Sequence, residues 1–153
     1  MKKEASVLAL WGKPNNGKSE TILKFVDLLI AHGAEIESAE NSWFNTTDKW
    51  FVLKYKSILI GVTSRGDTRA LLEEDFKNFM DCDICICATH TRGATVKFIE
   101  ETYCSNNIYW LRKSTLCVGT NNKDHFINEY LNRRQAEDML YFLENMLLNR
   151  RVI

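Results

Sequence analysis

The sequence predicts an α/β protein with three layers, in which a mostly parallel β-sheet that includes one antiparallel strand pair lies between helices. Short apolar segments alternate with longer segments of helical period along the 153 residues, and this alternation is typical of a parallel sheet that helices cover on both faces. Two strand-like segments within residues 49–64 follow each other too closely to be joined by a helix, so they form the antiparallel pair. No repeat, low-complexity stretch or glycine–serine linker divides the chain. We therefore expect one domain, residues 1–153.

The order of the elements follows from the period of the apolar residues and from the residues that end each segment. The expected strands are 7–11, 34–37, two within 49–64 that turn near Lys56 and Ser57, 82–89 and 107–114. The expected helices are 18–32, 67–80, 93–104 and 124–149. Gly33 is positioned to end the first helix, and Asp67 is one candidate to cap the second. The last helix is expected to break near Asn132, with its inner face formed by Phe126, Tyr130, Leu140, Leu143 and Leu147.

Charge and cysteine content limit the classes of partner and compartment. Twenty basic residues balance twenty acidic ones, so no net field attracts nucleic acid or a membrane surface, and neither is expected as a partner. The apolar run that follows Lys2 and Lys3 is too short for a signal peptide or a membrane span, which favours a cytoplasmic protein. Five cysteines without an export signal argue against a disulfide framework. Cys82 and Cys85 are spaced as C-x-x-C, but no second such pair is present, and we expect buried core thiols.

The segment "GKPNNGKS", residues 12–19, lies between the first predicted strand and the first predicted helix. Its fixed positions Gly12, Gly17, Lys18 and Ser19 match the pattern G-x-x-x-x-G-K-[ST] without a mismatch. Glycines at these positions let the backbone turn its N–H groups inward toward phosphate oxygens, and the following helix adds the positive end of its dipole. The segment is therefore predicted to bind a phosphate group.

This segment resembles the Walker A loop of the P-loop NTPase superfamily, and the resemblance covers residues 5–32. It implies that Lys18 contacts the β- and γ-phosphates and takes part in catalysis, and that Ser19 offers its hydroxyl to Mg²⁺. Neither the guanine-reading motif nor the D-x-x-G loop of small GTPases is present, so ATP is the default nucleotide. The residues expected to bind the nucleotide are Gly12, Lys13, Pro14, Asn15, Asn16, Gly17, Lys18, Ser19 and Glu20.

The family usually places a carboxylate at the end of an apolar strand near this loop, and this chain departs from that pattern. The strand that ends at Thr63 and Ser64 is followed by a carboxylate only at Asp67. Asp67 is a candidate metal ligand and catalytic residue, or else it only caps the following helix. Glu37 and Glu40, after the second predicted strand, are the alternatives.

Two further loops follow apolar strands and carry cations. Arg65 and Arg69 lie in one of them, and His90 and Arg92 lie in the other. In a parallel sheet both loops face the phosphates, so Arg65 and Arg92 are candidate catalytic residues that would neutralise charge during phosphoryl transfer. His90 is a weaker candidate general base.

Three functions remain open at this point. The first is a Mg²⁺-dependent NTPase that transfers a phosphoryl group from ATP to water. The second is a small-molecule or nucleotide kinase whose acceptor, a phosphorylated small molecule, is bound by the arginines; no lid segment is evident for it. The third is a slow nucleotide-binding switch that acts through a protein partner.

Overall fold

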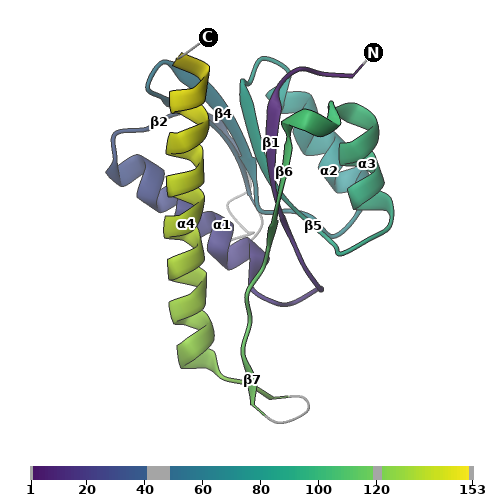
Figure 1. The fold of residues 1–153 in the computed structure, drawn as a ribbon, viewed down its shortest axis with the longest axis vertical. Coiled ribbons are helices and arrows are strands. Elements are labelled where there is room, and N and C mark those ends of the chain that lie inside the picture. The colour runs from purple at the N-terminus through teal and green to yellow at the C-terminus, as the bar shows by residue number, and fades with distance from the viewer. Residues whose placement is uncertain (1, 41–48, 119–121, 152–153) are drawn as a thin grey trace.

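A computed structural model of the chain describes residues 2–40, 49–118 and 122–151 (Figure 1). Its main sheet has six strands in the order β2-β3-β4-β5-β1-β6. Only β3 runs against its neighbours within this sheet, and the pairs β4–β5, β5–β1 and β1–β6 are parallel. The strands are β1 (Ser6–Trp11), β2 (Glu35–Ala39), β3 (Trp50–Tyr55), β4 (Ile58–Thr63), β5 (Ile84–Thr89) and β6 (Ile108–Arg112). The α/β class and the mostly parallel sheet are thus confirmed.

Helices lie on both faces of this sheet. The α-helices are α1 (Lys18–Ala31), α2 (Arg69–Phe76), α3 (Ala94–Thr102) and α4 (His125–Arg151). Short 3₁₀ helices, Lys77–Phe79 and Ser105–Asn107, follow α2 and α3. A small hairpin of β7 (Cys117–Val118) and β8 (Asn122–Lys123), which the sequence did not predict, precedes α4. None of the helices in the described ranges is both long and apolar enough to cross a membrane.

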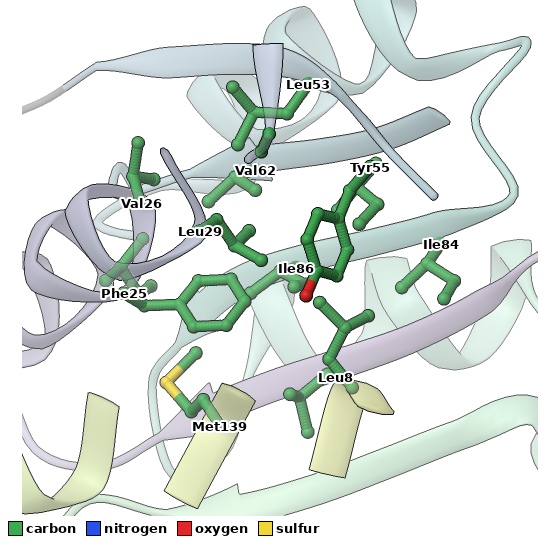
Figure 2. Packing of buried hydrophobic residues seen from close by; sticks show 14 of the residues in the cluster. Leu8, Phe25, Val26, Leu29, Leu53, Tyr55, Val62, Ile84, Ile86 and Met139 are labelled. Atoms are coloured by element: carbon green, nitrogen blue, oxygen red, sulfur yellow. The ribbon is translucent and has the colours of Figure 1, made fainter. Parts of the chain in front are cut away.

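The first core layer lies between the sheet and the helices α1 and α4. Leu8 and Leu10 of β1 contribute to it from the sheet, and Phe25 and Leu29 of α1 lie against them at helical spacing. Figure 2 shows these side chains from α1 beside Ile86 of β5 and Met139 of α4, with Ile84 farther along β5 beyond the Tyr55 ring. Because β1 and β5 are buried on both faces, they read as nearly continuous apolar runs.

The second core layer lies between the opposite face of the sheet and the helices α2 and α3. It contains Phe76, Phe98 and Tyr103 in edge-on ring contacts, together with the thiols of Cys82, Cys85 and Cys87. The expectation of buried core thiols is confirmed for these cysteines. Cys82 precedes β5, so it joins the same layer as Cys85 instead of facing the opposite side of the strand.

The structure confirms one local prediction, the turn between β3 and β4, and corrects another, the residue that caps α2. Lys56 and Ser57 both have positive φ, 50° and 67°, and they join β3 to β4 as the predicted two-residue turn. The second helix is capped by Thr68, whose hydroxyl accepts from the backbone N–H of Leu71, and not by Asp67. The prediction of Asp67 as the cap is therefore wrong, because the helix begins two residues later than expected.

The last helix differs from its prediction in two respects. It is continuous through Asn132, and its amino-terminal half extends past the carboxyl ends of the strands (Figure 1). Phe126 and Tyr130 lie on this extension and are 88% and 55% exposed, so they are not part of the inner face. Farther along, the inner face is formed by Ala136, Met139, Leu143, Met146 and Leu147. A helical period shows which residues share a face but not how far the sheet extends beneath it.

The carboxyl-terminal half of α4 is also attached to the β3–β4 turn by polar contacts. Glu144 accepts hydrogen bonds from the Tyr55 hydroxyl and from the Lys56 ammonium, the latter at 2.7 Å. Burial acts to raise the pKa of Glu144, but the hydrogen bonds from Lys56 and Tyr55 outweigh it and lower this pKa below its usual value.

Candidate functional site

The candidate site lies where the direction of the strand connections reverses. The connection that leaves β1 forms α1 on one face of the sheet, whereas the connection that leaves the neighbouring β5 forms α3 on the other face. The backbone N–H of Gly12 donates to the carbonyl of Thr89 at 3.2 Å, which joins the two strand ends. In open α/β sheets a crevice at such a point, beyond the carboxyl ends of the strands, is the usual position of a ligand.

The loop of residues 12–17 turns sharply from β1 into α1. Asn15 and Gly17 have φ of 59° and 90°, in the left-handed region, and successive N–H groups in such turns converge toward an anion. Gly17 is the residue that caps α1, and it has no side chain that could cover the helix end. The positive end of the α1 dipole therefore faces the crevice.

The Lys18 ammonium lies within this loop. It donates to the carbonyl oxygens of Gly12 and Lys13 at 2.9 and 2.7 Å, and it lies 3.4 Å from the Asn16 side-chain oxygen. The side chain is 8% exposed. These contacts hold a positive charge inside the loop, next to the amino terminus of α1.

A cavity of about 340 Å³ lies in front of this loop. Its lining residues come from the loop and α1, from the segment after β4, and from the end of β5. Although β5 separates β4 from β1, the Ser19 hydroxyl donates to the Ser64 carbonyl at 2.9 Å and bridges the gap. The residues that line this cavity, called here the loop cavity, are Asn15, Asn16, Gly17, Lys18, Ser19, Glu20, Ser64, Gly66, Asp67 and Ala88.

Among the candidate carboxylates, Asp67 lies in the loop cavity. It is exposed and shares the lining with Ser19 and Lys18. Glu40 instead forms an ion pair with Arg65 at 3.3 Å, and Glu37 is an exposed residue of β2, the outermost strand on that side of the sheet. Of the carboxylates weighed from the sequence, Asp67 is therefore the one brought to the loop.

Arg65 does not line the loop cavity, because Asp75 binds its guanidinium. Asp75 is completely buried on α2 and accepts from Arg65 Nε at 3.0 Å and from the Thr63 hydroxyl at 2.6 Å. The hydrogen bonds to Asp75 raise the pKa of Arg65, against the opposing effect of burial. The pair instead holds the segment of residues 63–67, and thereby Asp67, against α2.

The other cations named from the sequence also lie outside the lining of the loop cavity. Arg92 is exposed in the loop that precedes α3. Arg69 forms ion pairs with Glu73 and Glu101, both at 2.7 Å. The backbone N–H of His90 donates to the Thr95 hydroxyl, and its ring is not part of the lining.

A second cavity of about 590 Å³ lies between α1 and α4, and it is called here the helix cavity. It shares Asn15, Asn16, Gly17 and Glu20 with the loop cavity, so the two meet across the loop and the first turn of α1. The other lining residues are Leu23, Lys24, Asp27, Thr115, His125, Asn128, Glu129 and Asn132.

The far wall of the helix cavity is built from residues that match no sequence motif and were not predicted as site residues. Thr115 donates its hydroxyl to the Asn16 carbonyl at 3.2 Å. Asn128 of α4 both donates to and accepts from the Leu116 backbone, at 2.8 and 2.7 Å. Gln135, one α4 turn beyond Asn132, accepts from the Ser114 backbone N–H at 3.1 Å. These contacts tie the segment after β6 both to α4 and to the loop of residues 12–17.

Asn132 is the most unusual residue in this wall. It is 3% exposed, and its Nδ2 donates to Glu20 Oε2 at 3.1 Å. Glu20 thereby orients the amide so that Oδ1 faces Gly17, and no donor within the described ranges reaches this buried oxygen. A buried polar atom without a partner is costly and calls for a reason.

The described residues contain no group of three or more histidine, cysteine, aspartate or glutamate side chains placed to hold a metal ion. Ser19 and Asp67 do offer one hydroxyl and one carboxylate on the same cavity. Such a small set fits Mg²⁺, which keeps several waters and is usually bound by one or two protein groups together with substrate phosphates.

Comparisons of the chain with protein-family models, with curated proteins and with solved structures found no significant match.

Proposed function

We propose that this protein binds a nucleoside triphosphate in the loop cavity and, together with Mg²⁺, transfers the γ-phosphoryl group to water. The observation that carries the proposal is the loop itself, in which a left-handed turn, an exposed helix amino terminus and the Lys18 ammonium converge on one cavity. A polyphosphate chain is the common biological ligand that such a combination stabilises.

Each residue has a defined part in this proposal. The loop amides and Lys18 bind the β- and γ-phosphates and stabilise the negative charge on the leaving group. Mg²⁺ would be held by Ser19 and Asp67, and when bound it neutralises charge on the phosphates. Asp67, which is exposed and lines the cavity, would orient the attacking water. The water oxygen bonds to the γ-phosphorus as the bond to the β–γ bridging oxygen breaks, and one proton of the water passes to an oxygen of the transferred phosphoryl group, giving the nucleoside diphosphate and inorganic phosphate.

One observation favours slow turnover as the second candidate function, that of a nucleotide-dependent switch. Within the described part of the chain, Lys18 is the single positively charged residue in the lining of the loop cavity, and Arg65 is bound by Asp75. A cation that approaches the γ-phosphate would then have to come from a partner protein, as arginine fingers supplied in trans do. The arginines that the kinase alternative assigns to its acceptor, Arg65, Arg69 and Arg92, are not among the described residues that line the loop cavity.

The proposal is tested by ligand-dependent thermal stabilisation and by phosphate release. Mg-ATP is expected to raise Tm for the wild-type protein, because a ligand that binds only the folded state stabilises it. Lys18→Ala should abolish this shift, whereas Lys97→Ala, which removes an exposed lysine of α3, should leave it unchanged. Phosphate release that Lys18→Ala abolishes would establish hydrolysis. Binding without release would favour the switch, and an unchanged shift in Lys18→Ala would refute the proposal.

A further inference from the structure

The helix cavity is a candidate for the part of the ligand that carries no phosphate. Its lining contains the carboxylates of Glu20, Asp27 and Glu129 against the single ammonium of Lys24. A triphosphate is repelled from such a wall, whereas a neutral group with O–H and N–H donors is attracted to it. The loop cavity also contains two carboxylates, Glu20 and Asp67, but it adds Lys18 and the open amino terminus of α1. A nucleotide would therefore lie with its phosphates in the loop cavity and its uncharged half in the helix cavity.

We infer that the helix cavity receives the nucleoside half of the nucleotide, and that Glu20 accepts a hydrogen bond from an O–H or N–H donor of that nucleoside. The inference rests on the proposed function, because it takes the phosphates to lie in the loop cavity. Four residues are shared by the two cavities, so a ligand can pass from one to the other across Asn15–Gly17 without leaving the protein surface. The volume of about 590 Å³ lies within the range of cofactor sites.

Glu20 is placed for this role by α4. It lies in the first turn of α1, directly after Ser19, and it lines both cavities. The Asn132 amide donates to only one of its two carboxylate oxygens, and a carboxylate has about four acceptor positions in all. Asn132 is a positioning residue in this arrangement, since it fixes the carboxylate and does not face the cavity with its own buried oxygen.

The stability cost of the Glu20–Asn132 pair supports a ligand-binding role. The pair leaves Asn132 Oδ1 without a donor in the described part of the chain, and an apolar residue of similar volume would pack at this position without that cost. A polar pair that the fold does not need is expected where a ligand needs it.

The far wall is also rigid, as a recognition site requires. Thr115 binds the loop backbone at Asn16, and Asn128 binds the Leu116 backbone twice. Both side chains thereby connect the wall of the helix cavity to fixed elements, so the cavity keeps its shape before a ligand enters.

The test compares Mg-ATP with Mg-tripolyphosphate, which has the phosphates but no nucleoside, by isothermal titration calorimetry. The wild-type protein is expected to bind ATP at least about tenfold more tightly, as one hydrogen bond to a carboxylate and partial burial of a base would give. Leu23→Trp, which fills the helix cavity from α1, should remove this preference without weakening tripolyphosphate. Ile30→Trp places the same side chain on an exposed position of α1 outside the cavity and should change neither affinity.

Glu20→Gln gives a second and sharper readout. It should weaken ATP binding about tenfold through loss of a charge-assisted hydrogen bond, yet tripolyphosphate should bind no worse, because a negative charge next to the phosphates is removed. Weaker binding of dATP than of ATP would assign the ribose 2′-hydroxyl as the donor, and a difference between ATP and GTP would assign the base.

Several outcomes would overturn the inference. Equal affinity for ATP and tripolyphosphate in the wild-type protein would show that the nucleoside has no site. Equal losses of both ligands in Leu23→Trp would show damage to the loop instead. Unchanged affinity for ATP in Glu20→Gln would show that Glu20 accepts no hydrogen bond from the nucleoside, whereas equal binding of ATP, dATP and GTP by the wild-type protein would leave the 3′-hydroxyl, which all three carry, as the donor. If neither ATP nor tripolyphosphate binds, the proposed function itself has failed.

Discussion

The contact between Gly17 and Asn132 predicts that Gly17→Ala destabilises the protein through two separate costs. Gly17 has φ of 90°, and an L-residue in the left-handed region costs about 1–2 kcal/mol. A Cβ at this position would also lie 2.8 Å from Asn132 Oδ1 and 3.1 Å from Nδ2. Overpacking of this kind costs about 1–3 kcal/mol, so the free energy of unfolding should fall by roughly 2–5 kcal/mol in total.

Gly33 provides a matched control for the first cost alone. Its φ is 104°, and a Cβ there would meet no atom within 4 Å. Gly33→Ala should therefore lower the free energy of unfolding by only about 1–2 kcal/mol. Urea denaturation of both variants, followed by circular dichroism, measures the difference.

A double-mutant cycle then identifies the source of the second cost. In an Asn132→Ala background the added methyl group has space, so Gly17→Ala should cost about as much as Gly33→Ala. The coupling free energy should be about 1–3 kcal/mol, well above the error for independent sites of about 0.5 kcal/mol. Equal costs at the two glycines, together with no coupling to Asn132, would refute the reasoning.

Three further predictions concern the rest of the fold. Asp75→Ala leaves the half-buried Arg65 guanidinium and the buried Thr63 hydroxyl without this acceptor and should cost about 3–5 kcal/mol in urea denaturation, whereas Glu74→Ala, at an exposed neighbour, should cost under about 0.5 kcal/mol. Hydrogen bonds from Lys56 and Tyr55 lower the pKa of Glu144, so the ionised side chain should stabilise the fold by about 0.5–1 kcal/mol near neutral pH. The difference in unfolding free energy between wild type and Glu144→Gln should vanish as the pH falls through that pKa. A constant difference down to pH 2 would contradict the assignment. Half-buried Cys104 should be alkylated in the native protein, while Cys85, whose pKa burial raises to about 11, should react only in urea; equal rates under native conditions would contradict this.

Much of the fold could be predicted because local patterns specify it. The turn at Lys56 and Ser57 lies between two β-rich segments, and the loop of residues 12–19 lies between an apolar strand and an amphipathic helix; both are local features of the sequence. The lateral order of the strands could not be predicted in this way. The placement of β5 between β1 and β4 depends on how the whole sheet assembles and not on any one segment. Periodicity assigns a residue to a face and says nothing about which strand lies beside it.

Candidate site residues that lie together in one segment were predicted from the sequence. Contacts between residues far apart in the chain were not. Lys18, Ser19 and the glycines follow a fixed spacing, whereas Asn132 lies more than a hundred residues from Glu20, and nothing in its own segment indicates the contact. The arginines were selected because they follow apolar strands. The sequence could not show that a fully buried carboxylate on α2, Asp75, binds Arg65.

The buried, unpartnered oxygen of Asn132 has a consequence for laboratory evolution of this protein. A library screened for heat resistance alone should enrich apolar residues at position 132, because they relieve the cost of that oxygen. The same clones should lose affinity for nucleotide, since Glu20 would no longer be fixed at the mouth of the helix cavity. A screen that alternates heat challenge with capture on immobilised nucleotide should instead retain asparagine at this position, so the identity of residue 132 would record which pressure acted.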